Sequence, residues 1–233
     1  MRQAWADWME AMYAGLCPRS SSLTKEDFAD CCHQFFAKDE PVPTEKGLTV
    51  FERRIRRLAT SLELNAEVSV LQEVAQRATN AWQAHVRTDP SAHPVLAALG
   101  QTKTLALISN FDHPPHAYHV LRETGFDQHF KTIVVSGEVD VKKPNPEIFR
   151  IALEKTRLGP EDVVYVGDTQ EDVDGATAAG IRPILIVRPE DPWHARRLDF
   201  SSNENSATGH AVVPSAIIVS SLPEIVEIVE REP

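Results

Sequence analysis

Two carboxylates stand four residues apart after an apolar segment in the second half of the chain. Asp168 comes just after the run from Val163 to Val166, and Asp172 follows about one helical turn later. Neighbouring carboxylates repel each other unless a cation or a hydrogen-bond network lies between them, and Mg²⁺ prefers a few hard oxygen ligands together with water. The pair therefore predicts a magnesium site. The alternative is that Thr169 or Asp172 caps the next helix.

Ser109 and Asn110 end an earlier apolar segment, shortly before Pro114 and Pro115, which favour the start of a helix. A helix N-terminus presents unpaired N–H groups and the positive end of a dipole. Ser109 with its neighbouring amides could therefore bind a phosphate or a carboxylate. The alternative is that Ser109 or Asp112 only caps the helix.

Lys143 comes after the apolar run Thr132 to Val135 and precedes a proline. The proline ring restricts the backbone of the residue before it, which would aim the lysine side chain with limited freedom. An ammonium group can then act as a point charge for an anion. The alternative is a surface lysine in a proline-rich turn.

These polar residues require a sheet whose strands end at one edge. Beyond residue 90, short apolar runs alternate with helical patterns, which predicts a parallel α/β sheet with helices on both faces. Ligand sites of such sheets lie at the carboxyl ends of the strands. The predicted strands are Thr104 to Ile108, Thr132 to Val135, Val163 to Val166, Pro183 to Val187 and Ala216 to Val219.

The chain before residue 90 has a different pattern. Apolar residues recur at helical spacing from Trp5 to Met12 and from Leu58 to Trp82, which predicts helices only. Asp89 to Pro94 is expected to be a linker or turn. Ser201 to Gly209, rich in serine and asparagine, is expected to be a mobile loop.

Composition excludes several classes of partner. The 233 residues carry 24 basic and 34 acidic side chains, a formal net charge of -10, which makes nucleic acid and an anionic membrane unsuitable partners. The basic run Arg53 to Arg57 is expected to spread around the surface of a helix. The first ten residues lack an apolar signal core, and 18 apolar residues never run together.

Cysteine usage points to a reducing compartment. Cys17, Cys31 and Cys32 are odd in number and two of them are adjacent, which does not suit a secreted disulfide framework. We therefore expect a soluble cytoplasmic protein. Asp30 to His33 is expected to be a helix segment, because its spacing matches no standard zinc pattern.

The order of the motifs resembles a known family. Ile108-Ser-Asn-Phe-Asp112, Lys143-Pro-Asn-Pro-Glu-Ile-Phe149, Val166-Gly-Asp-Thr-Gln-Glu-Asp172 and Gly175-Ala-Thr-Ala-Ala-Gly180 closely resemble the last three motifs of the haloacid dehalogenase (HAD) superfamily. The similarity extends from residue 94 to about residue 225. It implies an α/β fold with a Rossmann-like parallel sheet at residues 91–233 and a helical cap domain at residues 1–90 that closes over the site and selects the substrate.

The resemblance also implies roles for individual residues. Ser109 would bind the transferred phosphoryl group with backbone help from Asn110, Lys143 would steady the same charge, and Asp168 with Asp172 would anchor Mg²⁺. The implied reaction is hydrolysis of a small phosphorylated metabolite. The oligomeric state stays open, with a dimer as one option.

The first motif of the family is not found in these 233 residues. It is an apolar strand that ends in Asp-x-Asp-x-Thr, whose first aspartate attacks phosphorus and whose second acts as general acid and base. Ahead of the cap-like half stands only Met1-Arg-Gln-Ala-Trp5, and Asp172-Val-Asp174 has the spacing but lies in the last motif. The core should therefore lack its first strand, and Mg²⁺ should bind weakly.

Three interpretations are compatible with this pattern. The first is a phosphatase-like hydrolase whose first strand and turn are encoded upstream of residue 1. The second is a catalytically inactive pseudoenzyme that keeps an anion and magnesium pocket for binding or regulation. The third is a haloacid dehalogenase. It is less favoured because Ser109-Asn110-Phe-Asp112 looks more like the phosphatase branch of the superfamily.

Two further expectations concern the surroundings of this site. His113, His116 and His119 recur every three residues, so they are expected either to contact substrate or to lie exposed on a helix, with exposure as the default. In the family the missing strand lies between the strands that end near Ile108 and Val166. We therefore expect these two strands to pair directly, or another segment or a second chain to fill the slot.

Overall fold

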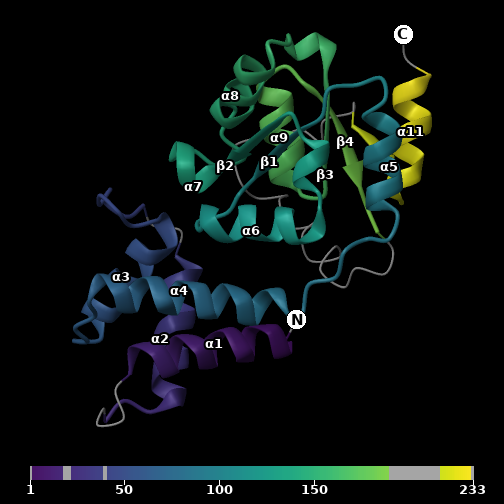
Figure 1. Cartoon of the computed structure of the whole chain (residues 1–233). Helices are drawn as coiled ribbons and strands as arrows, with labels where there is room; N and C mark the ends of the chain where they lie inside the picture. Colours follow the sequence, from purple (N-terminus) through teal and green to yellow (C-terminus); the bar gives the residue numbers. More distant parts are fainter. Residues whose placement is uncertain (1, 18–21, 39–40, 189–215, 232–233) are drawn as a thin grey trace, which may run out of the picture. The chain divides into compact units, whose positions relative to one another are not determined.

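The chain folds into two compact units. The computed structural model describes residues 2–17, 22–38, 41–188 and 216–231. Met1–Thr88 and Phe111–Leu121 form one unit, here called the helical unit, whereas Asp89–Asn110 and Arg122–Pro233 form the second, here called the sheet unit. Figure 1 labels the elements of both.

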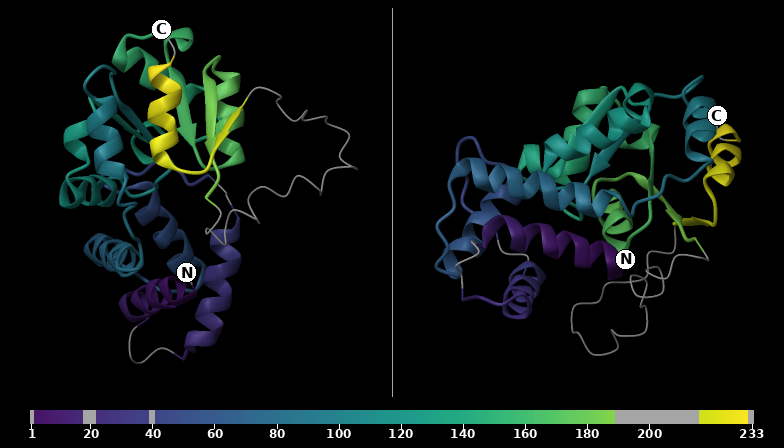
Figure 2. Two further views of the ribbon diagram at one scale, coloured as in Figure 1. Left: turned by 90° about the vertical axis from the view of Figure 1, so that its right-hand side faces the viewer. Right: turned by 60° about the horizontal axis from the view of Figure 1, so that its bottom comes forward.

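Four helices build most of the helical unit. Apolar side chains at helical spacing give α1, α3 and α4 a buried face each, and α1 lies alongside α4 (Figures 1 and 2). The core includes Met12, Phe28, Ile55, Leu58 and Leu71, all essentially inaccessible to solvent. The helices are α1 (Arg2–Leu16), α2 (Lys25–Ala37), α3 (Val50–Ser61) and α4 (Val68–Gln83), and α6 (Pro114–Thr124) begins in the same unit.

Threonine caps fix where two of these helices begin. The hydroxyl of Thr24 accepts a hydrogen bond from the backbone of Asp27 at the start of α2, and Thr49 forms a capping box with Glu52 at the start of α3. The expectation that the basic run of α3 spreads over the surface is wrong for Arg53. Its side chain is buried because its guanidinium donates to the carbonyl oxygens of Thr49 and Pro43.

The sheet unit contains parallel strands only, among the residues that the structure describes. β1 (Ala106–Ser109) pairs with β2 (Thr132–Val135), and β3 (Val164–Gly167) pairs with β4 (Arg182–Ile186), which pairs with β5 (Ile217–Val219). The predicted parallel α/β fold is therefore confirmed, with each strand within two residues of its expected position.

Helices cover both faces of the three-stranded sheet. Side chains alternate between the faces: Val164 and Val166 point to the cluster that includes α11, whereas Tyr165 points to the cluster of α8 and α9. The helix α5 lies beside α11 (Figures 1 and 2). The helices of the unit are α5 (Ala92–Leu99), α7 (Ser136–Val139), α8 (Glu147–Thr156), α9 (Gln170–Ala178) and α11 (Leu222–Glu230), with 3₁₀ turns at Asp127–His129 and Pro160–Asp162.

The predicted direct pairing of β1 with β3 is wrong. In the described residues β1 pairs only with β2 and β3 only with β4, which leaves a two-stranded and a three-stranded sheet. Ile108 from β1 and Tyr165 from β3 instead pack on one apolar cluster around Phe149 of α8. The prediction weighed the cost of unpaired backbone groups but not this packing, which holds the two sheets in one unit without a shared ladder. No other described strand pairs between β1 and β3, and filling of the slot by a second chain stays a prediction.

The expectations for individual segments outside the strands are confirmed in one case, wrong in another and untested in the rest. Asp30 to His33 lies within α2, as predicted, but the expected turn at Asp89 to Pro94 already contains the first residues of α5. The expected loop Ser201 to Gly209 lies outside the described residues. The division at residue 90 into a cap and a core stays a prediction. No described helix is long and apolar enough to cross a membrane.

Candidate functional site

Asp172 is the centre of a buried hydrogen-bond network in the sheet unit. One carboxylate oxygen accepts from Lys143 Nζ at 2.7 Å and from the hydroxyl of Tyr165 at 3.0 Å. The other accepts from the hydroxyl and backbone N–H of Thr169, at 2.7 and 3.0 Å, and from the backbone N–H of Asp168 at 3.1 Å. Five donors therefore hold a side chain that is only 2% exposed.

This network decides the charge of Asp172. Burial by itself raises the pKa of the carboxyl group, but the ammonium of Lys143 and the hydroxyls of Thr169 and Tyr165 outweigh that effect and hold the pKa below its ordinary value. Asp172 is consequently ionised at neutral pH. Burial and the adjacent carboxylate of Asp172 raise the pKa of Tyr165 far above its usual range, so its phenol stays protonated and acts as a donor.

Two glycines allow the network to form where it does. A Cβ atom on Gly167 would lie 2.2 Å from Cβ of Asp172, and a Cβ atom on Gly175 would lie 2.8 Å from the carbonyl oxygen of Pro144. Both distances are far below van der Waals contact. The glycines let the start of α9 approach β3 and the turn after Lys143 closely, which brings Asp172 to the lysine.

Asn110 holds the backbone of Lys143 in place. Its side-chain amide donates to the carbonyl oxygen of Lys143 at 3.0 Å and accepts from the backbone N–H of the same residue at 2.8 Å. The Lys143–Pro144 peptide bond is cis. The two hydrogen bonds of Asn110 join the loops that follow β1 and β2. The side chain of Lys143 is 13% exposed and reaches Asp172.

Ser109 lies at the same edge as these residues. It is the last residue of β1, half-buried, and its register partner is Val135, the last residue of β2. Gly167 ends β3, so Asp168 follows that strand directly. Since parallel strands carry their functional groups at their carboxyl ends, this region collects a hydroxyl and an ammonium, which can contact an anion, and two carboxylates, which can contact a cation.

The described residues supply only part of a metal site. No group of three or more His, Cys, Asp or Glu side chains that could hold a metal ion occurs in the part of the chain that the structure describes. Asp168 is half-buried at the end of β3, and both oxygens of Asp172 accept hydrogen bonds. The two carboxylates thus supply at most two protein ligands for Mg²⁺, and one of them, Asp172, is engaged by Lys143.

Sequence reasoning found some parts of this site and missed others. Thr169 caps α9 and forms a capping box with Asp172, which is the alternative that the sequence offered. The role of Tyr165 was missed because a tyrosine inside an apolar run looks like an ordinary strand residue. A hydroxyl two residues before a Gly-Asp strand end was the one available signal.

The default expectation for the three histidines at and just before α6 is wrong at two positions. His113 and His116 are buried in the helical unit, and only His119 is exposed. His113 Nδ1 lies 3.1 Å from the hydroxyl of Thr49, and its ring meets the ring of Phe51. Their burial follows from the packing of this segment against α3, which the three-residue spacing does not reveal. Contact of these histidines with a substrate stays untested.

Comparison with known proteins relates this geometry to a family. Residues 24–186 match the family described as haloacid dehalogenase-like hydrolase. A phosphoserine phosphatase from Thermus thermophilus is 40% identical over 108 residues, which cover 44% of this chain and 43% of that protein. The tyrosine-protein kinase PtkA from Mycobacterium tuberculosis is 28% identical over 166 residues, covering 71% of this chain and 54% of the kinase. These matches span about half the length of the relatives.

A solved structure supports the fold. The HAD phosphatase from Thermococcus onnurineus superposes with a TM-score of 0.63 over 98% of this chain and 89% of that chain, at 18% sequence identity. An identity this low shows the fold alone. The order of strands and helices in both units is therefore that of a known architecture.

Proposed function

Because the chain belongs to the haloacid dehalogenase-like hydrolase family, we propose that it serves the hydrolysis of a phosphomonoester of a small metabolite. The observation that carries the proposal is the position of Lys143. Its backbone is held by Asn110 and its ammonium by Asp172, at the edge where Ser109 ends β1. The phosphoserine phosphatase of Thermus thermophilus makes a phosphorylated hydroxy compound a suitable first substrate class.

Each residue then has a defined task. The hydroxyl of Ser109 and nearby backbone N–H groups bind the phosphoryl oxygens, and the ammonium of Lys143 neutralises part of their charge. Asn110 and Asp172 position Lys143, the first through its backbone and the second through its side chain. A lysine fixed in this way stabilises charge with little reorganisation when the phosphoryl group is transferred.

We propose Asp168 as the main ligand of Mg²⁺, with Asp172 as a second and weaker ligand. Mg²⁺, when bound, would add positive charge beside the phosphoryl oxygens. Because Lys143 occupies an oxygen of Asp172, much of the shell of the ion must be water, so the affinity should be low. Calorimetry should show binding weaker than micromolar that Asp168→Ala abolishes. Tight binding that survives this substitution would exclude Asp168 as the ligand.

The nucleophile separates the two main interpretations. Within residues 1–233 no Asp-x-Asp pair follows an apolar strand, so these residues should bind a phosphorylated ligand without hydrolysing it. A version extended upstream by a strand that ends in Asp-x-Asp should hydrolyse it. If the gene encodes no such strand, the chain is a binding or regulatory protein. Dehalogenation is the weaker alternative.

A phosphate-release assay with phosphoserine and Mg²⁺ tests the proposal. The extended version should be active, and Lys143→Met should lower the rate by at least about tenfold through loss of a charge-assisted contact. Lys155→Met, which removes an exposed lysine of α8, is the matched control and should leave the rate unchanged. Equal activity of the two lysine variants, or strong Mg²⁺-dependent activity of residues 1–233 that Ser109→Ala abolishes, would contradict these assignments.

We also propose that the protein works in the reducing cytoplasm. Three cysteines in a chain of net charge -10 support a cytosolic enzyme of small anions rather than a partner of nucleic acid or membrane. All three cysteines lie in the described residues, and each is a free thiol. A dimer is one option for the assembly, and size-exclusion chromatography with light scattering would test it.

A further inference from the structure

Two histidines of the sheet unit meet ring to ring, apart from the site described above. His93 lies in the first turn of α5, and His129 ends the 3₁₀ turn Asp127–His129, just before β2. His93 Nδ1 is 3.1 Å from His129 Nε2, and the centres of the two rings are 5.3 Å apart. The fold therefore brings together two imidazoles that lie 36 residues apart in the sequence.

The tautomer of His93 follows from its second contact. His93 Nε2 lies 2.8 Å from the carbonyl oxygen of Thr124, the last residue of α6. A carbonyl oxygen only accepts, so Nε2 carries the proton, and the lone pair of the neutral ring is on Nδ1. The ring of Phe126, with its centre 4.4 Å from that of His93, packs on the same imidazole. The lone pair of His93 is thus aimed at His129 Nε2, which donates to it.

The separation of the two nitrogen atoms suits a shared transition-metal ion. Histidine nitrogens bind Zn²⁺ at about 2.0–2.1 Å, so two of them in a tetrahedral shell lie about 3.3 Å apart. The 3.1 Å between His93 Nδ1 and His129 Nε2 is close to this separation. A histidine that binds a metal also generally donates its other ring N–H to a carbonyl or a carboxylate, as His93 does to Thr124.

We propose that His93 and His129 bind a divalent transition-metal ion, with Zn²⁺ as the reference ion. His93 Nδ1 and His129 Nε2 are the two protein ligands, and water completes the shell. On binding, His129 exchanges its proton from Nε2 to Nδ1 through water, so the ion replaces the hydrogen between the rings and no net proton is released. The exchange costs little, because His93 is exposed and a hydrogen bond accessible to water contributes little net stability.

This site is separate from the proposed magnesium site. Imidazole nitrogen suits Zn²⁺, Ni²⁺ and Cu²⁺, whereas Mg²⁺ prefers oxygen ligands. Neither Asp168 nor Asp172 takes part, so the inference does not depend on the hydrolysis proposed above. With two protein ligands, the ion should bind more weakly than in a structural zinc site, which has four.

Calorimetry with zinc chloride on the full chain carrying Asp168→Ala tests the pair without the proposed magnesium ligand. In this background, His93→Gln and His129→Gln should each weaken Zn²⁺ binding by about tenfold or more, because each removes one of two ligands. A hundredfold excess of Mg²⁺ should not displace Zn²⁺ from the parent. The absence of saturable Zn²⁺ binding, or its displacement by Mg²⁺, would overturn the proposal.

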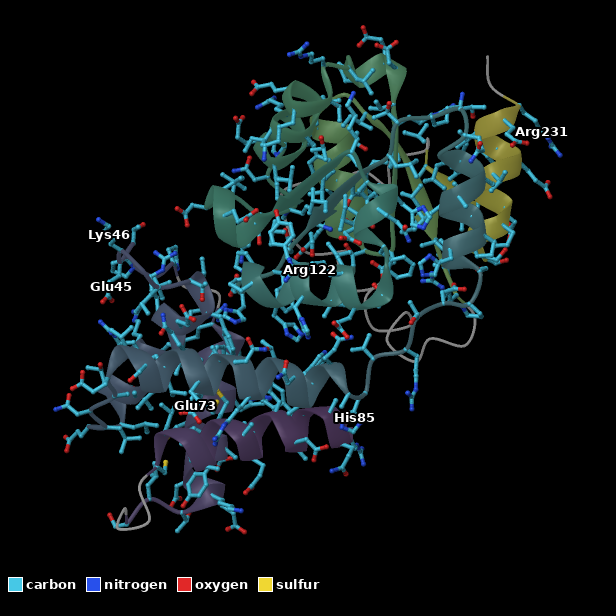
Figure 3. The ribbon with its side chains drawn as sticks, viewed as in Figure 1. Glu45, Lys46, Glu73, His85, Arg122 and Arg231 are labelled. Carbon is cyan, nitrogen blue, oxygen red and sulfur yellow. The ribbon has the colours of Figure 1, made fainter. Side chains whose placement is uncertain are left out.

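His85→Gln is the matched control. His85, labelled in Figure 3, belongs to the helical unit, and its Nε2 lies 2.7 Å from a carboxylate oxygen of Asp7. This variant removes a histidine outside the pair and should bind Zn²⁺ like the parent. Unchanged affinity in the His93 and His129 variants, or an equal loss in His85→Gln, would contradict the assignment.

Carbethoxylation by diethyl pyrocarbonate tests the site without any substitution in the pair. The reagent attacks the imidazole lone pairs that the ion would occupy. At a Zn²⁺ concentration about ten times Kd, occupancy of about 90% should slow modification of His93 and His129 about tenfold. Mass spectrometry should find the rate at His119, an exposed histidine of α6, unchanged. An unaltered rate at His93 and His129 would overturn the proposal even if the variants failed to fold.

Discussion

Asp172 in the sheet unit and His116 in the helical unit are buried to a similar degree, but they differ in their hydrogen-bond partners and in their charge. Asp172 is 2% exposed and five donors satisfy its carboxylate, whereas His116 is 3% exposed and its Nδ1 has no hydrogen-bond partner among the residues that the structure describes. Both pKa values are lowered. Partners keep Asp172 charged, while burial and the neighbouring histidines lower the pKa of His116 to about 4 and keep it neutral.

The difference shows what each unit requires of its polar residues. A buried charge is stable only when its lone pairs are filled, and its removal leaves the partners unsatisfied. A neutral ring can be tolerated with one unpaired nitrogen at a smaller cost. Asp172 therefore organises the site of the sheet unit, whereas His116 mainly fills space, with its ring stacked on Phe111.

Asp172→Ala should have the largest effect. It leaves Lys143 without its ion-pair partner and unties the start of α9, so the free energy of unfolding should fall by about 3–5 kcal/mol. Urea denaturation measures the change. Asp174→Ala, which removes an exposed carboxylate of the same helix, should cost far less. A loss below about 1 kcal/mol for Asp172→Ala would show that the network is not a stabilising unit.

Gly167→Ala should disturb the same network without removing any of its members. The added methyl group would meet Cβ of Asp172 at 2.2 Å, so the carboxylate must move away from its donors at a cost of about 2–3 kcal/mol. Gly159→Ala is the control, because there the new atom meets only the end of the flexible Glu161 side chain. Equal stability of the two variants in urea would contradict the close approach of Asp172 to β3.

Acid should act first through His113 and His116, because burial lowers the pKa of both below the ordinary 6.5. The pKa of His116 is about 4 when folded, so below pH 6.5 the unfolded chain takes up a proton that the folded chain refuses. Stability should therefore fall as the pH drops from about 6.5 to 4, with at most about 3 kcal/mol of the decline due to His116. Denaturation midpoints at stepped pH measure this. The lowered pKa of Asp172 acts in the same direction but only below its ordinary value of 3.8.

His116→Phe should have the smallest effect and the opposite sign. It replaces an unsatisfied nitrogen with an apolar ring of similar shape, which should raise the free energy of unfolding by about 1 kcal/mol at pH 7. The variant should also lose the part of the decline between pH 6.5 and 4 that His116 contributes, while the part due to His113 remains. His119→Phe is the exposed control on the same helix and should retain that decline. A destabilised His116→Phe would indicate that the imidazole has a required polar contact.

The sequence predicted the framework of the sheet unit because its signals are local. Apolar runs placed the strands within two residues, and Thr169 with Asp172 carried the capping pattern of α9. The contact of Asp172 with Lys143 could not be read in this way. It depends on the close approach that Gly167 and Gly175 permit between elements far apart in the chain.

Tertiary packing explains the remaining errors. The spacing of His113 and His116 is compatible with an exposed or a buried helix face, and only their packing in the helical unit decides between them. Arg53 is buried because its guanidinium donates a hydrogen bond to the carbonyl oxygen of Pro43, which lies outside α3. Neither the burial of polar residues nor the separation of β1 from β3 has a signature at short sequence range.

The separation of β1 from β3 has a consequence for local opening of the sheet unit. Cooperative unfolding follows hydrogen-bonded and packed neighbours. In the described residues the two ladders share no backbone pairing and are coupled by side chains around Phe149 and by the contacts of Lys143 with Asn110 and Asp172. Amide hydrogen exchange should accordingly divide the strands into two sets. The amides of β1 and β2 should exchange at one rate, those of β3, β4 and β5 at another, and Phe149→Ala should widen the difference by loosening the packing between them.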